Sequence, residues 1–444
     1  MFMNLGFALI AALLTQAQAA PPAPPTAEAT VTAALAKATT PADCVTAVRA
    51  YLTKRREEAR PATGWTAETL KKVDDEKLAY AKNCADRFPV ATTRPGLLAG
   101  LADLLIEAGQ PQQAAEALGR ARAEKTLTAV ERADTLGASV RIILTEPKSD
   151  ERNARLEKLV DELDALPNTY VDQKFTAHMA MNSYYRYDDI DGGIIKHSTW
   201  LIDAVKAGDP ALRAKYAPRV VSAYVNLAEA WAGQGRNDDA IAILRRAAAD
   251  LPDLPATTVA RSVQPEIERL QLVGMPAAAI AAPRWLNMPA GTTALDMKGK
   301  VTLLEFSAHW CIPCKESYPG VNRLLAKYGP KGFRVVLGTQ MYGYFEKERD
   351  IMPDVEFARD EVYFAEHGMH VPIAVGDRVT AKVVDGQVQY LPARNPNDMN
   401  YKVGGIPQIH LIDKQGRIRL VMVGYDDANE SKLAKMIEAM LAEK

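Results

Sequence analysis

The sequence predicts a two-domain protein, an all-α N-terminal domain followed by an α/β C-terminal domain, and three observations support this. Between about residues 42 and 275, Ala, Leu, Glu and Arg dominate, apolar residues recur at helical spacing, and Pro or Gly stand at the breaks. Between residues 281 and 444, strand-like apolar runs alternate with helical stretches, as in α/β domains. A chain of 444 residues is also long for a single hydrophobic core.

The charge balance of the chain indicates which kinds of partner to expect. The sequence carries 54 basic and 55 acidic residues, a formal net charge of −1, without a long run of one sign. We therefore see no electrostatic reason to expect nucleic acid or an anionic membrane surface as a partner.

Residues 1–19 are similar to a secretory signal peptide. An apolar stretch at 5–14 precedes the small-x-small sequence Ala17-Gln18-Ala19, although no Lys or Arg stands before it. A buried N-terminal helix is the alternative, but Pro21-Pro22 follows directly. We expect cleavage after Ala19 and an exported protein without stable membrane insertion, because the apolar stretch is short for a membrane span. Residues 20–41, rich in Ala, Pro and Thr, are expected to form a linker.

Two segments of the helical region share one pattern of small and large residues at identical offsets. The pattern predicts a helix hairpin, with Ala where two helices touch, Gly at the turn, and large apolar residues in the groove. It resembles the tetratricopeptide repeat, and residues 184–201 form a degenerate copy. An unrelated helical bundle with chance spacing is the alternative. The two segments are Leu98, Leu101, Ala102, Leu105, Gly109, Ala114, Leu118, Ala121 and Tyr224, Leu227, Ala228, Trp231, Gly235, Ala240, Leu244, Ala247.

Cys44 and Cys84 are candidates for a structural disulfide. Cys44 lies near the start of a helix predicted over 42–58, and Cys84 near the end of one predicted over 67–86. If these helices form an antiparallel hairpin, the start of one neighbours the end of the other. A disulfide closing this loop would stabilise the fold by about 4 kcal/mol in the chain-entropy model. Two buried, unpaired thiols are the alternative.

The α/β region shows a regular alternation of expected strands and helices. Strands are predicted over 301–307, 333–338, 371–375, 408–413 and 417–423, with helices over 312–328, 354–367 and 428–442. A hairpin is predicted from 379–384 to 387–391, with its turn at Asp385-Gly386.

A Cys-x-x-Cys motif follows the first of these strands directly and opens a helix. At a helix N-terminus the backbone N–H groups and the dipole favour a thiolate, so Cys311 is the expected nucleophile. Cys314, one turn further, is shielded and placed to attack a mixed disulfide on Cys311. Pro313 suits the first helical turn, where no intrahelical partner for its missing N–H is lost.

Residues 281–444 resemble the exported TlpA/ResA-like branch of thioredoxin-like thiol–disulfide oxidoreductases, with a strand-rich head of the kind that peroxide reductases share. The likeness rests on the segment 304–315, on the head 282–300, and on Gly404-Gly405-Ile406-Pro407-Gln408. It implies a thioredoxin-like fold in which a cis Pro407 packs against the cysteine pair. It further implies that the backbone of Ile406 pairs with substrate, and we expect Trp310 and Pro313 to contact substrate as well.

Two features set this sequence apart within that likeness. Extra residues at 339–353 and in the predicted hairpin lie beside the expected active site and are expected to influence partner docking. Glu305 stands six residues before Cys311, where thioredoxins carry a buried acid. Burial there should raise its pKa and let it exchange a proton with Cys314. A Glu305 side chain turned to solvent is the alternative.

The histidines of this region give no metal site. His309 could tune the thiolate, and an exposed loop histidine is an equal alternative. His367 and His370 could suggest zinc, but a single Cys-x-x-Cys at a strand-to-helix junction argues against it. We expect neither a metal nor a cofactor.

The leading functional hypothesis is a bacterial periplasmic or secreted enzyme that reduces protein disulfides. Cys311 would attack and Cys314 would resolve, a membrane electron donor would keep the pair reduced, and the helical domain would bind or position partners. A thiol peroxidase is an alternative, but Leu304 and Ala308 occupy the places of its required Pro and Thr or Ser. A helical interaction scaffold with a redox-sensing domain is the third hypothesis.

Overall fold

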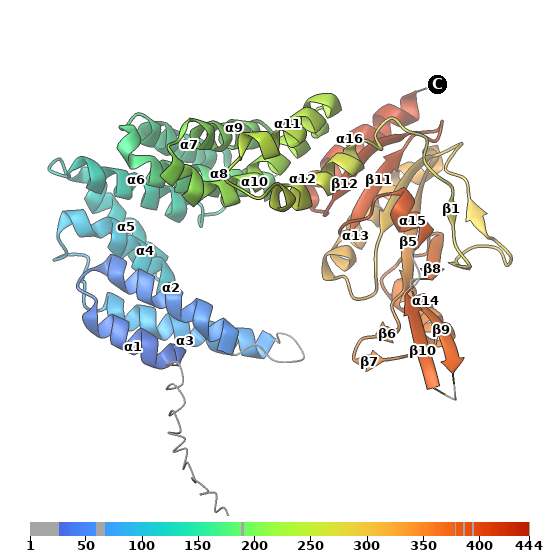
Figure 1. Cartoon of the computed structure of the whole chain (residues 1–444), viewed down its shortest axis with the longest axis horizontal. Helices are drawn as coiled ribbons and strands as arrows, with labels where there is room; N and C mark the ends of the chain where they lie inside the picture. The colour runs from blue at the N-terminus through green and yellow to red at the C-terminus, as the bar shows by residue number, and fades with distance from the viewer. Residues whose placement is uncertain are drawn as a thin grey trace, which may run out of the picture. The chain divides into compact units, whose positions relative to one another are not determined.

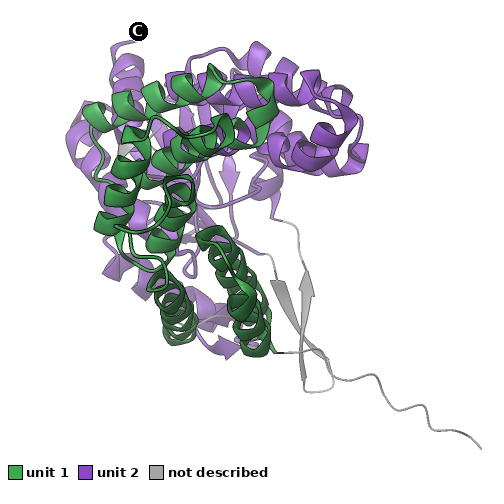
Figure 2. Ribbon diagram, turned by 90° about the vertical axis from the view of Figure 1, so that its left-hand side faces the viewer, with its two compact units in different colours: residues 1–174 green, residues 175–444 purple. Residues whose placement is uncertain are grey.

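The computed structural model describes residues 26–58, 67–187, 191–377, 379–384, 387–392 and 395–443. Two compact units divide the chain, residues 1–174 and residues 175–444 (Figure 2). The predicted signal peptide lies outside the described residues. Within the described ranges, no helix has the length and apolar character needed to cross a membrane.

The first unit is built from helices. Helix α1 occupies part of the segment expected to be a linker, so that expectation is wrong for these residues. Thr26 caps α1 by accepting a hydrogen bond from the backbone N–H of Ala29, and Val31 packs against Ala47 and Tyr51. The helices are α1 (Ala27–Lys37), α2 (Pro41–Glu58), α3 (Ala67–Ala85), α4 (Leu98–Glu107), α5 (Pro111–Ala123), α6 (Ala129–Ile143) and α7 (Asp150–Asp164), with α8 (Val171–Tyr187) crossing the unit boundary.

The second unit begins with helices and ends with a mixed α/β region (Figure 1). Its boundary lies inside α8, whereas the sequence changes character near residue 280. The domain limits 42–275 and 281–444 describe this change of secondary structure and stay a prediction. The helices are α9 (Asp191–Ala207), α10 (Pro210–Gly233), α11 (Asn237–Asp250) and α12 (Ala256–Leu270).

Both predicted helix hairpins form, α4 with α5 and α10 with α11. Gly109 and Gly235 lie at the two turns with φ of 70° and 78°, a conformation that favours glycine. The Ala and Leu positions of the pattern are buried, and Trp231 is partly buried. The resemblance to tetratricopeptide repeats itself remains a prediction.

A six-stranded sheet forms the centre of the α/β region. Its order is β12-β11-β4-β5-β8-β2, with β4, β5 and β8 parallel and the other pairings antiparallel. This mixed sheet, with helices α13 (Ile312–Tyr328) and α16 (Asp427–Ala442), gives a thioredoxin-like fold. The strands are β2 (Arg284–Leu286), β4 (Val301–Phe306), β5 (Phe333–Met341), β8 (Ile373–Asp377), β11 (Gln408–Ile412) and β12 (Ile418–Val423).

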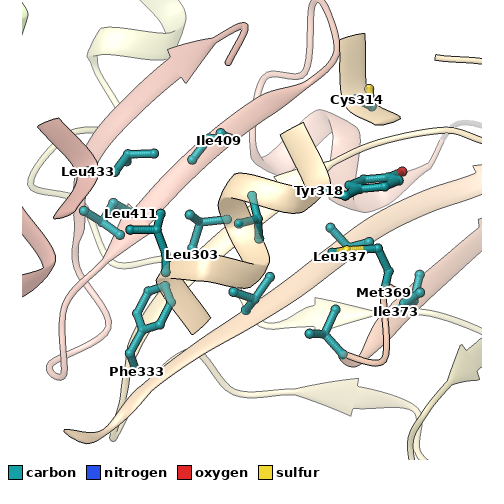
Figure 3. Close-up of a cluster of buried hydrophobic side chains, with 14 of the residues drawn as sticks. Leu303, Cys314, Tyr318, Phe333, Leu337, Met369, Ile373, Ile409, Leu411 and Leu433 are labelled. Carbon is teal, nitrogen blue, oxygen red and sulfur yellow. The ribbon is translucent and has the colours of Figure 1, made fainter. Parts of the chain in front are cut away.

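Strand β4 is buried on both faces, and its side chains are apolar except for Thr302 and Glu305. Val301 and Leu303 point into a core that includes residues of α13 and α16, part of which Figure 3 shows. Leu304 and Phe306 point to the opposite face and pack with Tyr401. Because side chains alternate along a strand, Glu305 lies on the α13 side of the sheet.

The residues that exceed a minimal thioredoxin form two additions. One contains the short strands β6 (Tyr344–Phe345) and β7 (Glu348–Arg349) and leads into α14 (Pro353–Glu366). The other is the predicted hairpin, formed by β9 (Val379–Val384) and β10 (Gln387–Pro392). Its predicted turn at Asp385-Gly386 lies outside the described residues. The head contributes the strand pair β1 (Ile280–Ala281) and β3 (Ala294–Leu295), and α15 (Pro396–Asn400) precedes the loop to β11.

Candidate active site

The cysteine pair lies at the N-terminus of α13, directly after β4. Cys311 is the N-cap residue, and its Sγ accepts a hydrogen bond of 3.2 Å from the backbone N–H of Cys314. The two cysteines are joined as a disulfide, with their Cα atoms 5.2 Å apart. Pro313 occupies the first turn of α13, as the sequence predicts. The helix N-terminus can therefore stabilise a thiolate on Cys311 once the bond is reduced.

Exposure differs sharply around the motif. Cys314 is fully buried and Cys311 is 3% exposed, whereas Trp310 and Ile312 are 45% and 71% exposed. Two large apolar side chains thus flank the disulfide on the surface. Such exposed apolar groups next to a reactive centre are suited to contacts with another polypeptide.

Glu305 lies behind the cysteine pair and is fully buried, which excludes the alternative of a solvent-facing side chain. Its Oε1 lies 2.8 Å from the hydroxyl oxygen of Ser317, one turn beyond Cys314 in α13. Burial raises the pKa of Glu305 to about 8, and the hydrogen bond with Ser317 opposes this shift. The Glu305 carboxyl is therefore largely protonated at neutral pH in this disulfide form.

The hydrogen bonds of Ser317 are compatible with a protonated Glu305. The hydroxyl oxygen of Ser317 also lies 2.6 Å from the carbonyl oxygen of Cys314. A hydroxyl has one proton, and the backbone carbonyl can only accept. If Ser317 donates to that carbonyl, a protonated Glu305 can donate to Ser317. Within the part of the chain that the structure describes, Oε2 of Glu305 has no hydrogen-bond partner.

The loop before β11 carries the predicted proline. The Ile406–Pro407 peptide bond is cis, and Ile406 packs against the core that contains both cysteines. The side chain of Gln408 holds this loop, because its Oε1 accepts from the N–H of Gly404 and its Nε2 donates to the carbonyl of Tyr401. The loop is therefore held in one conformation, with Ile406 at the core that contains the cysteine pair.

A buried histidine, His410, contacts the side chain of Gln408. The Nε2 atoms of Gln408 and His410 are 2.9 Å apart, so the amide donates to an unprotonated imidazole nitrogen. Burial lowers the pKa of His410 to about 3, and the nearby Arg269 lowers it further. His410 is therefore neutral, which keeps it available as an acceptor.

His309 is buried at 9% exposure, so the alternative of an exposed loop histidine is wrong. Its ring stacks on Phe345 at a centroid distance of 4.6 Å and meets Tyr342 edge-on at 5.7 Å. Both partners belong to the first additional segment, so packing against the insertion buries a residue that local sequence leaves ambiguous. Burial lowers the pKa of His309 to about 4.

One acid of α14, Glu356, attaches this insertion, and a second acid, Asp360, is buried on the same helix. Glu356 is fully buried and accepts hydrogen bonds from the backbone N–H groups of Tyr342 and Gly343, at 2.6 and 2.8 Å. Burial, and then the charge of Glu356, raise the pKa of Asp360 to about 8. Tyr342 in turn meets Trp310 edge-on at 5.4 Å. The insertion thereby becomes part of the rim around the active site.

The other predicted residues belong to the first unit or concern a metal centre. Cys44 and Cys84 are bonded within the buried core of the first unit, with Cα atoms 6.3 Å apart. Across the described residues, no three His, Cys, Asp or Glu side chains group so that they could hold a metal ion.

Sequence reasoning missed several residues of the site. Ser317 could have been found from its position one turn after Cys314, on the same side of the helix. Gln408 follows the proline directly and was read only as the start of a strand. Tyr342 and Glu356 gave no local signal, since their role depends on packing between segments distant in sequence.

Comparisons with known proteins show similarity to thioredoxin-like proteins over part of the chain. A scan against protein-family models found no match. Curated relatives include the thiol-disulfide oxidoreductase ResA of Bacillus thuringiensis (strain Al Hakam), 26% identical over 131 residues, and that of Geobacillus thermodenitrificans (strain NG80-2), 28% identical over 130 residues. Each match covers 29% of this chain and 58% of the relative.

A comparison with solved structures also returned matches. The thiol-disulfide isomerase of Corynebacterium glutamicum is 23% identical, and the match covers 38% of this chain and 97% of that one, with a TM-score of 0.28. The curated relatives show that part of the chain is homologous to thioredoxin-like thiol–disulfide oxidoreductases. These relatives are ResA proteins, and the chain spans somewhat more than half of their length.

Proposed function

We propose that this chain is a thiol–disulfide oxidoreductase that reduces disulfides of protein substrates through Cys311 and Cys314. The placement of Cys311 at the N-cap of α13 is the observation that carries the proposal, because this position favours a nucleophilic thiolate. The homology to the ResA proteins supports the same class of reaction.

The reaction would proceed in two exchanges. The Cys311 thiolate attacks one substrate sulfur, forms a mixed disulfide, and releases the other substrate sulfur as a thiolate that takes a proton from water. The Cys314 thiol then gives its proton to the Glu305 carboxylate and attacks the Cys311 sulfur, which frees the second substrate sulfur. Two electrons pass to the substrate, and the protein ends as a disulfide with Glu305 protonated.

Side chains around the pair would assist substrate binding. Ile406 would offer backbone hydrogen bonds, Pro407 would shape the site, and Trp310 and Pro313 would contact the substrate chain. The exposure of Trp310 and the fixed loop at Gln408 support these roles. The helical domain would bind or position partners.

We further propose that the protein is exported to the bacterial periplasm or secreted, and that a membrane electron donor returns Cys311 and Cys314 to the dithiol. The signal-like residues 1–19 and the Cys44–Cys84 pair support export, since disulfides persist in oxidising compartments. A donor is required because each turnover consumes one dithiol.

An insulin reduction assay tests the enzyme proposal. The full chain, kept reduced by dithiothreitol, should accelerate reduction of the insulin disulfides, and Cys311→Ser should abolish the acceleration. Equal rates for wild type and Cys311→Ser would contradict the proposal. The matched control is Ser262→Ala, a change of a single exposed hydroxyl on α12.

A further inference from the structure

A large groove opens beside the cis-proline loop in the second unit. Its volume is about 1330 Å³, and its walls include α12 on one side and Trp310 with Gly404, Gly405 and Ile406 on the other. Small-molecule pockets usually measure about 300–1,000 Å³. This groove exceeds that range and contains the edge at which Ile406 would meet substrate, so its size fits a polypeptide segment.

Helix α12 has one face in the helical core and another along the groove. Val259 and Val263 are buried against α10 and α11, in the helical core. Arg261, Gln264 and Glu268 lie on another face, at spacings of three and four residues, and line the groove. These polar side chains are therefore not needed for helix packing and can contact a bound chain.

The position of α12 relative to the cis-proline loop is fixed at two points. A Cβ atom built on Gly404 would lie 3.0 Å from Nη1 of Arg269, which shows how closely the end of α12 approaches the loop. Beyond α12, the chain pairs with the edge strand β12, where Ile418 accepts from the N–H of Gly274 at 2.7 Å and donates to the carbonyl of Met275 at 3.0 Å. The helix is thus held as a wall beside the loop.

The charges along the groove favour one kind of segment. Two acids line the groove. Glu268 accepts a hydrogen bond from Gln264 at 3.0 Å, and Asp398 accepts one from Asn395 at 3.2 Å, so each carboxylate is partly satisfied by a neighbouring amide. Among the described residues, Arg261 and Lys402 form no ion pair, although both line the groove. Two cations without an ion-pair partner in the groove can attract an acidic group of a bound chain.

We propose that α12 forms the outer wall of a groove for an extended substrate segment, and that Arg261 selects segments with an acidic side chain near the target disulfide. This proposal rests on the proposed reductase function and names its substrate class. It assigns the last helix of the helical region a direct part in specificity.

Two oxidised peptides of equal length test the charge preference. Each carries one internal disulfide, flanked by Glu in one peptide and by Lys in the other. The pre-reduced full chain should show the lower KM for the Glu peptide. Arg261→Glu should raise the KM for the Glu peptide by about 3- to 10-fold and lower the KM for the Lys peptide, with kcat retained. Arg261→Lys keeps the positive charge, so it should show the wild-type preference for the Glu peptide.

The control is Arg219→Glu, an equal charge reversal at an exposed position of α10 that does not line the groove. This variant should change neither KM. Equal KM shifts for both peptides, or none, in Arg261→Glu would overturn the groove proposal while leaving the reductase intact. If wild type reduces neither peptide nor the neutral probe 2-hydroxyethyl disulfide, the proposed function fails and the groove proposal fails with it.

A cross-linking experiment tests the geometry independently of charge. In a Cys314→Ser background, the Glu peptide should remain bound to Cys311 as a mixed disulfide. A photoreactive phenylalanine analogue in place of Gln264 should then cross-link to the trapped peptide, and the same analogue in place of Arg219 should not. A trapped peptide that Gln264 fails to capture would overturn the assignment of α12 as the wall.

Discussion

The hydroxyl oxygen of Ser317 lies 2.8 Å from Oε1 of Glu305 and joins the buried acid to the helix that carries the cysteine pair. The same hydroxyl lies 2.6 Å from the carbonyl oxygen of Cys314. One hydroxyl proton therefore serves two oxygens, and a protonated Glu305 satisfies both contacts. This arrangement holds the acid next to the resolving cysteine and leads to the first prediction.

Glu305→Gln should slow resolution by Cys314 while leaving attack by Cys311 nearly intact. The helix N-terminus still stabilises the Cys311 thiolate, but the Cys314 proton loses its nearby acceptor. General-base assistance is worth about 10²–10⁴-fold, and we expect the lower part of this range because water can partly substitute. In wild type, decay of the mixed disulfide should accelerate as the pH rises through about 8, the pKa that burial gives to Glu305.

Stopped-flow measurements with a thiol-labelled substrate separate formation of the mixed disulfide from its decay. Glu316→Gln, at an exposed position of the same helix, is the matched control and should behave like wild type. Unchanged decay in Glu305→Gln across neutral pH would show that Glu305 carries no proton in this step.

The same raised pKa predicts that Glu305 destabilises the oxidised protein as the pH rises. Its pKa lies near 8 in the folded chain against an ordinary value of 4.5, so between these values the folded state holds a proton that the unfolded chain has lost. Stability therefore falls with rising pH, by on the order of 3–5 kcal/mol over the whole window.

Thermal melts of wild type and Glu305→Gln at several pH values check this. The variant should melt at the higher temperature above pH 7, and the difference should shrink toward pH 5. Asp360 titrates in the same window in both proteins, so its contribution cancels in the comparison. A difference in melting temperature that grows toward low pH would contradict the raised pKa of Glu305.

The Cys44–Cys84 pair should contribute to stability and not to turnover. The cysteines are separated by 40 positions, and the chain-entropy model gives about 4 kcal/mol for closing such a loop. The double variant Cys44→Ala/Cys84→Ala should therefore lower the melting temperature of the oxidised chain and retain insulin reduction. Mass mapping that finds both cysteines as free thiols in exported protein would contradict the pairing.

The two hairpin glycines offer a matched pair of substitutions. Gly109→Ala and Gly235→Ala should each destabilise the protein by roughly 1–2 kcal/mol, because both glycines have positive φ. Gly109→Ala should cost more, since its new Cβ would lie 3.2 Å from Cδ1 of Leu78, whereas a Cβ at Gly235 meets nothing within 4 Å. Urea unfolding measures the difference, and two unchanged midpoints would contradict the left-handed turns.

Local sequence patterns were sufficient for the elements around the active site. The strand before Cys311 and the helix after it were predicted within a residue, because apolar runs, Pro313 and the cysteine spacing are short-range signals. The helix at 27–37 was missed because its Ala- and Thr-rich composition resembles a linker, and its burial depends on α2. The burial of His309 could not be predicted, because it depends on contact with Phe345, which the folded insertion brings next to it.

The most direct test of the account is the identity of the sulfur that carries the substrate in a trapped complex. The Cys314→Ser variant, reduced and mixed with an oxidised peptide, should accumulate a mixed disulfide that peptide mapping by mass spectrometry assigns to Cys311. Cys311→Ser, treated in the same way, should accumulate none, because Cys314 is fully buried. A complex carried by Cys314, or no complex with either variant, would contradict the assignment of Cys311 as the attacking thiolate.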